Sequence, residues 1–186
     1  MTKIKIIGLA GPAGSGKDTV ADYLCERYAL RKYSFASPLK MACREMFGLT
    51  DLQLSDEKKE EVIPFWGLSP RQMYQKLGTE GARDLFFSDI WVKRAQVFYQ
   101  QEACSPCLII DDVRFENEAA WIRSEGGSII HVVREKNDSA TEHDQHASEY
   151  GIVPIDPDWT IVNRTSIKDL KEAADSVLDI IIDEGL

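Results

Sequence analysis

The sequence has no apolar run that approaches the ~20 residues a helix needs to cross a bilayer. Its N-terminal segment carries Lys3 and Lys5, but it has neither the apolar stretch nor the cleavage site of a secretory signal peptide. We therefore expect a cytoplasmic protein that has no membrane partner.

Positive charge is also scarce, with 22 Lys and Arg residues against 31 Asp and Glu residues and a formal net charge of −9. A protein that binds DNA broadly needs a basic face that displaces counterions from the phosphates. We therefore expect no nucleic-acid partner. A small anionic ligand is not excluded, because a few local cations can offset an acidic exterior.

Cysteine and histidine are few, with four and three residues in a chain of 186. In a cytoplasmic protein the cysteines are expected to be reduced thiols. Cys104 and Cys107 have the spacing of a redox or zinc motif. The sequence offers no two further zinc ligands at a compatible spacing, so a short turn that leads into a strand is favoured. His143 and His146 lie in a polar stretch, where solvated side chains are more common than a metal site.

Apolar segments that alternate between two periodicities predict an α/β fold. The expected strands are 3–10, 33–36, 107–111, 128–133 and 159–163. The expected helices are 17–29, one capped by Ser37 with Pro38 at its first position and ended by Gly48, 69–77 with a capping box, 89–102, one from Phe115 to Gly126, and one capped by Ser166. Strands that alternate with helices imply a parallel, doubly wound sheet. Residues 49–68 are acidic and are expected to form an irregular, mobile insert.

The stretch "GPAGSGKDT" follows the first expected strand directly. It contains Gly11, four residues, then Gly16 and Lys17, the pattern of a loop whose backbone N–H groups wrap phosphates at a helix N-terminus. In such a loop Lys17 would reach the β- and γ-phosphates of a nucleoside triphosphate. The alternative is a glycine-rich turn without a ligand.

The residue after Lys17 departs from the usual loop, in which a Ser or Thr hydroxyl meets Mg²⁺. Here Asp18 takes that position and Thr19 follows. Two unit charges ~4 Å apart repel by about 4 kcal/mol at an effective dielectric of 20, so Asp18 is acceptable beside a triphosphate only if Lys17 and Mg²⁺ lie between them. Mg²⁺ prefers carboxylate, phosphate and water oxygens, and we expect Asp18 to bind it directly or through water. The alternative is that Asp18 caps the helix.

Polar residues follow the later strands as well. Asp112, Arg134 and Asn163 lie at or just after the third, fourth and fifth expected strands. Because ligands in parallel sheets bind beyond the carboxyl ends of the strands, we expect these residues to converge with the glycine-rich loop. Asp112 is suited to act on metal-bound water or on the incoming nucleophile, and Arg114 to make a bidentate phosphate contact. Alternatively, Asp111 and Asp112 cap the following helix.

Two further regions suit ligand binding. Residues 134–151 are polar and lack apolar periodicity, which predicts a lid in which Arg134 neutralises phosphate charge during transfer. Residues 71–95 mix cations such as Arg71 with aromatic residues such as Trp91, a combination that suits a nucleotide base and its phosphate. An ordinary helical hairpin with Trp91 in the core is equally compatible with this pattern.

The motifs, taken in chain order, extend over most of the sequence. They are "SGKDT" (15–19), "FASPLK" (35–40), "LGTE" (77–80), "DIWVK" (89–93), "DVRFENE" (112–118), "GGSIIHVVR" (126–134), "HASEYGI" (146–152) and "VNRTSIKDL" (162–170). This ordered set resembles the phage deoxynucleoside monophosphate kinases, members of the P-loop nucleoside-phosphate kinase group. The segment 49–68 is short compared with longer members of that family, and "NRTS" replaces the more usual "NDGS".

The resemblance implies one P-loop NTPase domain over 1–186, with a five-stranded parallel sheet flanked by helices, an acceptor-binding helical region at 31–102 and a short lid at 134–151. It implies that adenine lies near Asn163 and that the ATP phosphates contact Gly11, Ala13, Gly14, Ser15, Gly16, Lys17, Asp18 and Thr19. It implies that the acceptor monophosphate lies near Lys40, Gly78, Thr79, Trp91, Asp112, Arg114 and Glu118, with His146 and Glu149 contributed by the lid.

The expected reaction transfers the γ-phosphoryl group of ATP to a deoxynucleoside 5′-monophosphate, with Mg²⁺ as cofactor. Lys17, Arg114 and Arg134 would spread the developing charge, and Asp112 would orient a metal-bound water or Arg114. One alternative is another small P-loop kinase, such as a dephospho-coenzyme A kinase, whose hydroxyl acceptor needs a base. Another is a nucleotide-binding module without turnover. The sequence settles neither the base preference nor the oligomeric state, and a homodimer is compatible with it.

Overall fold

The computed structural model describes residues 5–55, 57–101, 107–134, 151–164 and 166–183. The chain forms two compact units, Met1–Ser34 with Ala95–Leu186, and Phe35–Arg94. The second unit falls within the predicted acceptor-binding region 31–102. The helices and strands of the chain are, in order, β1 (Lys5–Ala10), α1 (Lys17–Tyr28), β2 (Arg31–Tyr33), α2 (Ala36–Phe47), α3 (Asp51–Leu54), α4 (Pro70–Gln75), the π-helix η1 (Lys76–Arg83), α5 (Ile90–Gln101), β3 (Cys107–Val113), α6 (Glu116–Ser124), β4 (Ser128–Arg134), β5 (Trp159–Asn163) and α8 (Ile167–Asp183).

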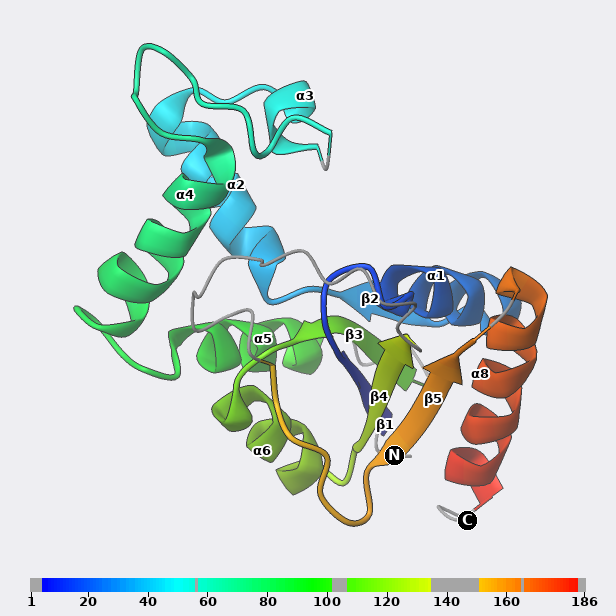
Figure 1. Cartoon of the computed structure of the whole chain (residues 1–186). Coiled ribbons are helices and arrows are strands. Elements are labelled where there is room, and N and C mark those ends of the chain that lie inside the picture. Colours follow the sequence, from blue (N-terminus) through cyan, green and yellow to red (C-terminus); the bar gives the residue numbers. More distant parts are fainter. Residues whose placement is uncertain (1–4, 56, 102–106, 135–150, 165, 184–186) are drawn as a thin grey trace. The chain divides into compact units, whose positions relative to one another are not determined.

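The first unit is built on a five-stranded parallel sheet with the strand order β2-β3-β1-β4-β5 (Figure 1). The predicted fold class, a parallel α/β sheet flanked by helices, is therefore confirmed. All five predicted strands exist, and four of them overlap the observed strands closely. Strand β1 lies at the centre of the sheet, so the loop that follows it is flanked by the carboxyl ends of β3 and β4.

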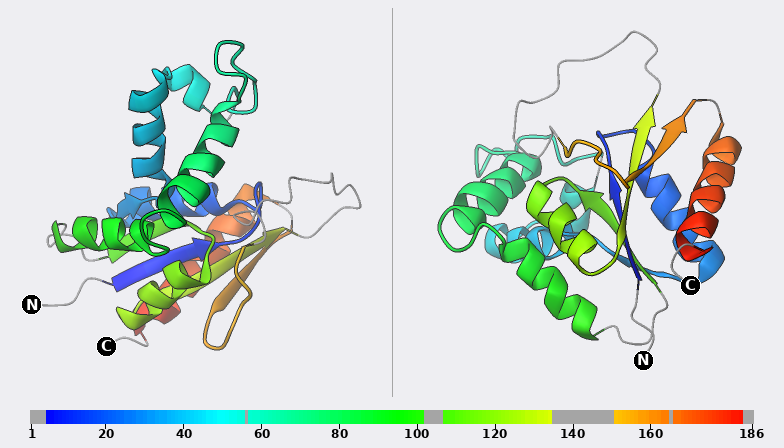
Figure 2. Two further views of the ribbon diagram at one scale, coloured as in Figure 1. Left: turned by 90° about the vertical axis from the view of Figure 1, so that its left-hand side faces the viewer. Right: turned by 90° about the horizontal axis from the view of Figure 1, so that it is seen from below.

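The pleat of β1 separates the two faces of this sheet. Ile7 and Leu9 belong to a buried core that includes residues of α1 and α8. Between them, Gly8 faces the opposite side, where an added Cβ would lie 2.7 Å from Ile122 of α6. Helices α1 and α8 accordingly cover one face and α6 the other (Figure 2). This alternation explains why β1 is apolar from Ile6 to Ala10, as expected for a central parallel strand with both faces covered.

The second strand and the following helix begin earlier than predicted. Strand β2 is Arg31–Tyr33 rather than 33–36, and α2 begins at Ala36 with Phe35 as its N-cap. Ser37 is therefore not the capping residue. Pro38 is tolerated in the first turn because the first four N–H groups of a helix have no partner within it. The predicted end of the helix at Gly48 is confirmed, since that residue is left-handed with φ 62°.

The second unit contains more helix than the sequence predicted. Ser69 opens α4 with the expected capping box, but the chain does not stop before Gly78 and continues through η1. Gly78 instead allows η1 to pack closely against α2, because an added Cβ would lie 2.7 Å from the Leu39 side chain of α2. The expectation of an irregular segment at 49–68 was wrong in part, since Thr50 caps α3 there and Ile63 bridges Leu68. Among the described residues, no helix is both long and apolar enough to cross a membrane.

Candidate active site

The glycine-rich loop connects β1 to α1 through three glycines in the left-handed region. Gly11, Gly14 and Gly16 have φ values of 137°, 72° and 108°, which other residues rarely adopt. Gly11 has a second reason to lack a side chain, because an added Cβ would collide with the backbone carbonyl of Val132 in β4. The loop thus closes tightly against the neighbouring strand and ends at the N-terminus of α1, where backbone N–H groups attract anions.

Lys17 lies folded over this loop. Its Nζ donates hydrogen bonds of 2.8 Å to both the Gly11 and the Pro12 carbonyl oxygens, and the residue is only 7% exposed. These hydrogen bonds hold a cationic group at the loop, where it would attract a bound anion. The predicted contact of Lys17 with the phosphates of a nucleotide stays a prediction.

Asp18 is exposed in the first turn of α1, one residue after Lys17. The N-cap position is taken by Gly16, so the alternative in which Asp18 caps the helix is wrong. A carboxylate in the first turn is stabilised by the helix dipole. Asp18 is therefore free of a capping role and open to a cation that accompanies a bound phosphate chain.

The end of β3 carries a bulge that changes the positions of the two aspartates. Gly8 pairs with Ile110 and Ala10 with Val113, so β3 has one extra residue between these pairs. Asp111 and Asp112 lie in this bulge, within the strand and before α6 begins at Glu116. The alternative in which they cap the following helix is therefore wrong, and Phe115 is its N-cap.

Asp112 and Asp111 have different surroundings. Asp112 Oδ2 accepts a hydrogen bond of 2.7 Å from Ser34 Oγ. Asp111 is buried and ion-paired with Lys32 Nζ at 3.3 Å, while its Oδ1 is buried without a hydrogen-bond partner. Burial and the nearby Asp112 charge raise the pKa of Asp111 to about 6, although Lys32 opposes the shift. Because perturbed carboxyl groups concentrate at functional sites, Asp111 joins the candidate site.

The sequence assigned Asp111 and Lys32 no role at the site. Asp111 was visible as one of two carboxylates at the end of an apolar strand, but Asp112 was favoured over it. Lys32 was missed because β2 was placed two residues too late. It bridges two carboxylates, since its Nζ also lies 2.6 Å from Asp22 of α1. A strand that begins two residues earlier, at Arg31, puts Lys32 beside β3.

The ends of β4 and β5 complete this edge of the sheet. Arg134 and Asn163 are paired in register, and the Arg134 side chain is exposed. Asn163 Nδ2 donates a 2.9 Å hydrogen bond to the Ser15 carbonyl oxygen in the glycine-rich loop. The predicted convergence of the loop with residues at the ends of β3, β4 and β5 is thus observed within the first unit.

Glu118 is turned toward the backbone at the start of α6. Its Oε2 accepts hydrogen bonds from the N–H groups of Arg114 (2.9 Å) and Phe115 (3.1 Å), and the residue is 2% exposed. The structure therefore shows Glu118 fixing the turn that carries Arg114. Its predicted contact with an acceptor stays a prediction, as does that of Arg114, which is half-buried.

The remaining predicted acceptor residues belong to the second unit. Trp91 is half-buried and donates a 3.0 Å hydrogen bond from Nε1 to the Gly78 carbonyl oxygen, so it braces η1. Thr79 is the next residue of η1, and a π-helical segment is frequently found at functional sites. Lys40 is exposed on α2, whereas Arg71 is ion-paired with Glu60 at 2.9 Å.

Part of the predicted site lies outside the described residues. This holds for the lid segment from residue 135 to 150, with His143, His146 and Glu149, and for Cys104 of the paired cysteines. Within the parts of the chain that the structure describes, no group of three or more His, Cys, Asp or Glu side chains could hold a metal ion. A divalent cation at this site would therefore need oxygen ligands from a substrate or from water.

Comparison with known proteins agrees with this geometry. The family model for deoxynucleotide monophosphate kinase matches residues 5–63 and 49–174. The chain belongs to the deoxynucleotide monophosphate kinase family. The two matched stretches overlap at residues 49–63, within the segment 49–68.

Relatives from viruses match nearly the whole chain. A putative deoxynucleotide monophosphate kinase of Acanthamoeba polyphaga mimivirus is 35% identical over 188 residues, covering 94% of this chain and 96% of the relative. The deoxynucleotide monophosphate kinase of Enterobacteria phage T4 is 26% identical over 246 aligned residues, covering 96% and 100%.

Solved structures show the same fold at low identity. TT1252 from Thermus thermophilus superposes with a TM-score of 0.55 at 19% identity, covering 95% of this chain and 97% of its own. A dephospho-CoA kinase from Campylobacter jejuni superposes with a TM-score of 0.53 at 12% identity, covering 97% and 98%. The P-loop kinase fold of this deoxynucleotide monophosphate kinase family member is thereby confirmed.

Proposed function

We propose that the protein transfers the γ-phosphoryl group of ATP to a deoxynucleoside 5′-monophosphate, giving ADP and the deoxynucleoside diphosphate. The observation that carries this proposal is the phosphate-binding loop, with three left-handed glycines and Lys17 already folded over it. Membership of the deoxynucleotide monophosphate kinase family supports the choice of acceptor. The substrates are small molecules, and we place the reaction in the cytoplasm, where they occur.

The residues at the carboxyl ends of the strands supply charge and positioning. Lys17 lies at the loop, and Arg134 is exposed at the end of the neighbouring strand β4. Phosphoryl transfer needs little covalent help from a protein, so catalysis consists mainly of alignment and charge neutralisation. The acceptor is a phosphate dianion, which already carries the attacking lone pair. Asp112, which accepts a hydrogen bond from Ser34, therefore positions other groups and does not act as a strong base.

The donor set fits a magnesium ion that is held chiefly by phosphates. Asp18 is exposed in the first turn of α1, and Asp111 has one buried oxygen without a partner. Mg²⁺ typically takes one or two protein carboxylates together with phosphate and water oxygens. When bound, it would offset the phosphate charge that would otherwise repel Asp18. We assign Asp18 as the carboxylate that faces the ion, either directly or through water.

A panel of acceptors in a coupled ADP-release assay tests the proposal. The panel contains dGMP, dTMP, dCMP, dAMP, GMP and dephospho-coenzyme A, each with saturating Mg·ATP. We expect turnover with at least one deoxynucleoside monophosphate and none with dephospho-coenzyme A. Turnover with dephospho-coenzyme A alone would assign the chain to a different kinase reaction.

ATP binding, measured on the same protein as turnover, distinguishes an enzyme from a binding module. Tight ATP binding without any acceptor-stimulated ADP release would mean that the chain is a nucleotide-binding module. Comparison of GMP with dGMP in the same panel measures how strictly ribose is excluded.

A further inference from the structure

We propose that Asn163 is a positioning residue for the phosphate loop and acts on donor phosphates, not on the adenine base. This inference rests on the proposed donor site and goes beyond it by assigning a role to a residue of a distant strand. Asn163 and Ser15 are 148 positions apart in sequence, yet Asn163 Nδ2 donates a 2.9 Å hydrogen bond to the Ser15 carbonyl oxygen.

The hydrogen bond fixes the orientation of one peptide group of the loop. In a trans peptide the C=O of one residue and the N–H of the next point in opposite directions. Asn163 holds the Ser15 carbonyl on the side of β5, so the N–H of Gly16 points to the other side. Gly16 is the N-cap of α1, and N–H groups at this end of a helix are those that receive anions.

The absence of a side chain at Gly16 makes room for this arrangement. A Cβ added to Gly16 would lie 2.9 Å from Asn163 Nδ2 and 3.0 Å from Leu170 Cδ2 of α8. Gly16 is also left-handed, with φ 108°. The glycine and the asparagine are therefore complementary, because any larger residue at Gly16 would push the amide away from the Ser15 carbonyl.

Asn163 itself is held by a rigid frame. It is the last residue of β5, in register with Arg134 of β4, and α8 is the next element of the chain and begins at Ile167. Helix α8 is fastened to α1 at Asp175, whose Oδ2 accepts a 2.7 Å hydrogen bond from Tyr23 and whose Oδ1 accepts a 3.0 Å hydrogen bond from Tyr28.

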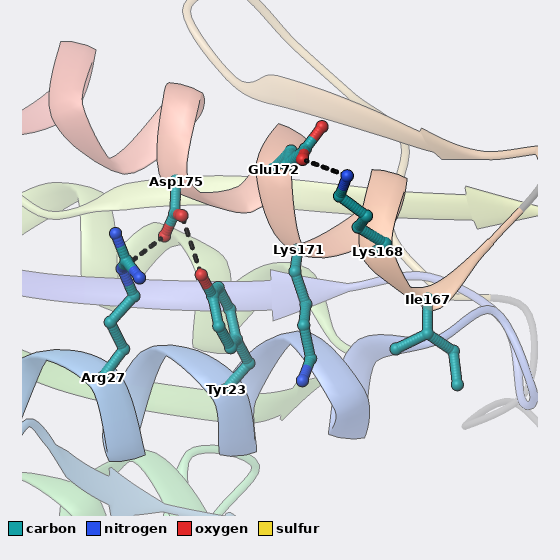
Figure 3. A pocket seen from close by; sticks show the side chains of 7 residues that line it. All are labelled: Tyr23, Arg27, Ile167, Lys168, Lys171, Glu172 and Asp175. Atoms are coloured by element: carbon teal, nitrogen blue, oxygen red, sulfur yellow. Dashed lines mark hydrogen bonds and ion pairs between the residues drawn. The ribbon is translucent and has the colours of Figure 1, made fainter.

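The same carboxylate also lies 3.4 Å from Arg27 Nε, and Tyr23, Arg27 and Asp175 line a surface cavity that residues of both helices form (Figure 3). The helix that begins at the phosphate loop and the helix that follows Asn163 are thus bound to each other. A strand end held in this way can fix the direction of a loop peptide. Phosphoryl transfer requires the donor phosphates to be held in a defined orientation, which a fixed loop N–H group supports.

Tripolyphosphate, a ligand that lacks the nucleobase, distinguishes a role at the phosphates from a contact with adenine. Binding of Mg·tripolyphosphate and of Mg·ATP is measured by calorimetry for the wild type, Asn163→Ala and Asn163→Gln, with Thr160→Ala on the same strand as the matched control. We expect Asn163→Ala to weaken the binding of both ligands by the same factor of about tenfold, as for loss of one part-buried hydrogen bond. Asn163→Gln, which keeps an amide donor, should recover part of the affinity, and Thr160→Ala should leave both affinities unchanged.

Kinetics and a double-mutant cycle give two further readouts. Asn163→Ala should raise the KM for ATP and for GTP by equal factors while the KM of the acceptor stays within twofold. The effects of Gly16→Ala and Asn163→Ala should be less than additive, because the first substitution already displaces the amide.

Each contrary outcome has a distinct meaning. Unchanged tripolyphosphate affinity with a loss confined to ATP would overturn the inference and assign Asn163 to the adenine. Equal loss accompanied by a large drop in the urea midpoint would also overturn it, because Asn163 would then only support the fold. A wild-type protein that binds neither ligand would refute the proposed donor site itself, whereas binding without any acceptor turnover would refute only the proposed reaction.

Discussion

Ser34 and Asp112 are joined by a 2.7 Å hydrogen bond, in which the Ser34 hydroxyl donates to Asp112 Oδ2. Ser34 is the last residue of the first segment of the first unit, directly before the chain enters the second unit at Phe35. The carboxylate at the end of β3 is therefore oriented by a residue of the first unit that directly precedes the second unit in sequence.

This pair predicts a positioning effect. In Ser34→Ala, Asp112 keeps its charge but loses one donor that fixes its rotamer, so we expect kcat to fall by about three- to tenfold. The KM for ATP and the thermal midpoint should change little, and the exposed Ser37→Ala serves as the control in steady-state assays. An unchanged kcat in Ser34→Ala, combined with a large loss in Asp112→Asn, would show that Asp112 is oriented by other groups.

Lys17 gives a second prediction. Lys17→Met keeps the apolar stem over the loop but removes the ammonium that hydrogen-bonds the Gly11 and Pro12 carbonyls. We expect a loss of at least about 10²-fold in kcat, the scale for removal of one group that stabilises transition-state charge.

The thermal stability of Lys17→Met should change far less than its kcat. The control is Lys168→Met, which removes a surface ammonium paired with Glu172 at 3.6 Å and should keep full activity. Single-turnover assays measure the rate of phosphoryl transfer, and thermal unfolding measures the stability of each variant. Loss of the fold in Lys17→Met would mean that the ammonium mainly holds the loop together.

The buried Asp111 predicts a dependence of stability on pH. Its pKa is raised from 3.8 to about 6 by burial first and by Asp112 second. The folded state therefore binds this proton more tightly than the unfolded state, and the stabilisation is fully present below pH 4 and is lost as the pH rises through about 6. A shift of about two units corresponds to about 3 kcal/mol at neutral pH and above.

Asp111→Asn removes this cost, so the variant should be more stable than the wild type at pH 8 and similar to it at pH 4. Urea unfolding at both pH values measures the difference. Asp22→Asn, which removes the exposed partner of Lys32, is the matched control and should change stability by at most about 1 kcal/mol at either pH. Equal effects of the two substitutions at pH 8 would contradict a special role for the buried carboxyl.

The sheet and the glycine-rich loop could be predicted because both depend on local sequence. Short apolar runs such as 107–110 are typical of central strands with both faces covered, and strand ends in a parallel sheet meet at one edge. Gly11, Gly16 and Lys17 indicated the loop by their spacing alone. These patterns predict the edge of the sheet at which Asp112, Arg134 and Asn163 lie.

Three features could not be predicted because they depend on contacts between distant residues. The bulge in β3 gives Asp111 and Asp112 different surroundings, and it changes neither composition nor periodicity. Gly78 appeared to end a helix, whereas it makes room for Leu39. The hydrogen bond from Asn163 to Ser15 joins residues 148 positions apart in the sequence, so no local pattern indicates it, and the expected position of adenine near Asn163 stays a prediction.

Asp18 gives the last prediction, on the cation that accompanies ATP. The residue is exposed in the first turn of α1 and does not cap the helix, so its carboxylate is accessible to a metal ion, as we propose. Asp18→Ala should raise the KM for Mg·ATP by about tenfold and shift the Mg²⁺ dependence to higher concentration, while the KM of the acceptor stays within twofold. Titration of Mg²⁺ at fixed ATP measures this shift.

The conservative variant for this test is Asp18→Ser, which restores the hydroxyl found at this position in most phosphate loops. A hydroxyl can meet Mg²⁺ but carries no charge, so Asp18→Ser should recover most of the Mg²⁺ affinity if the role is metal binding. If Asp18 acts only through the helix dipole, Ser and Ala should behave alike, because both remove the charge. A fall in acceptor affinity alone would show that Asp18 does not face the metal ion.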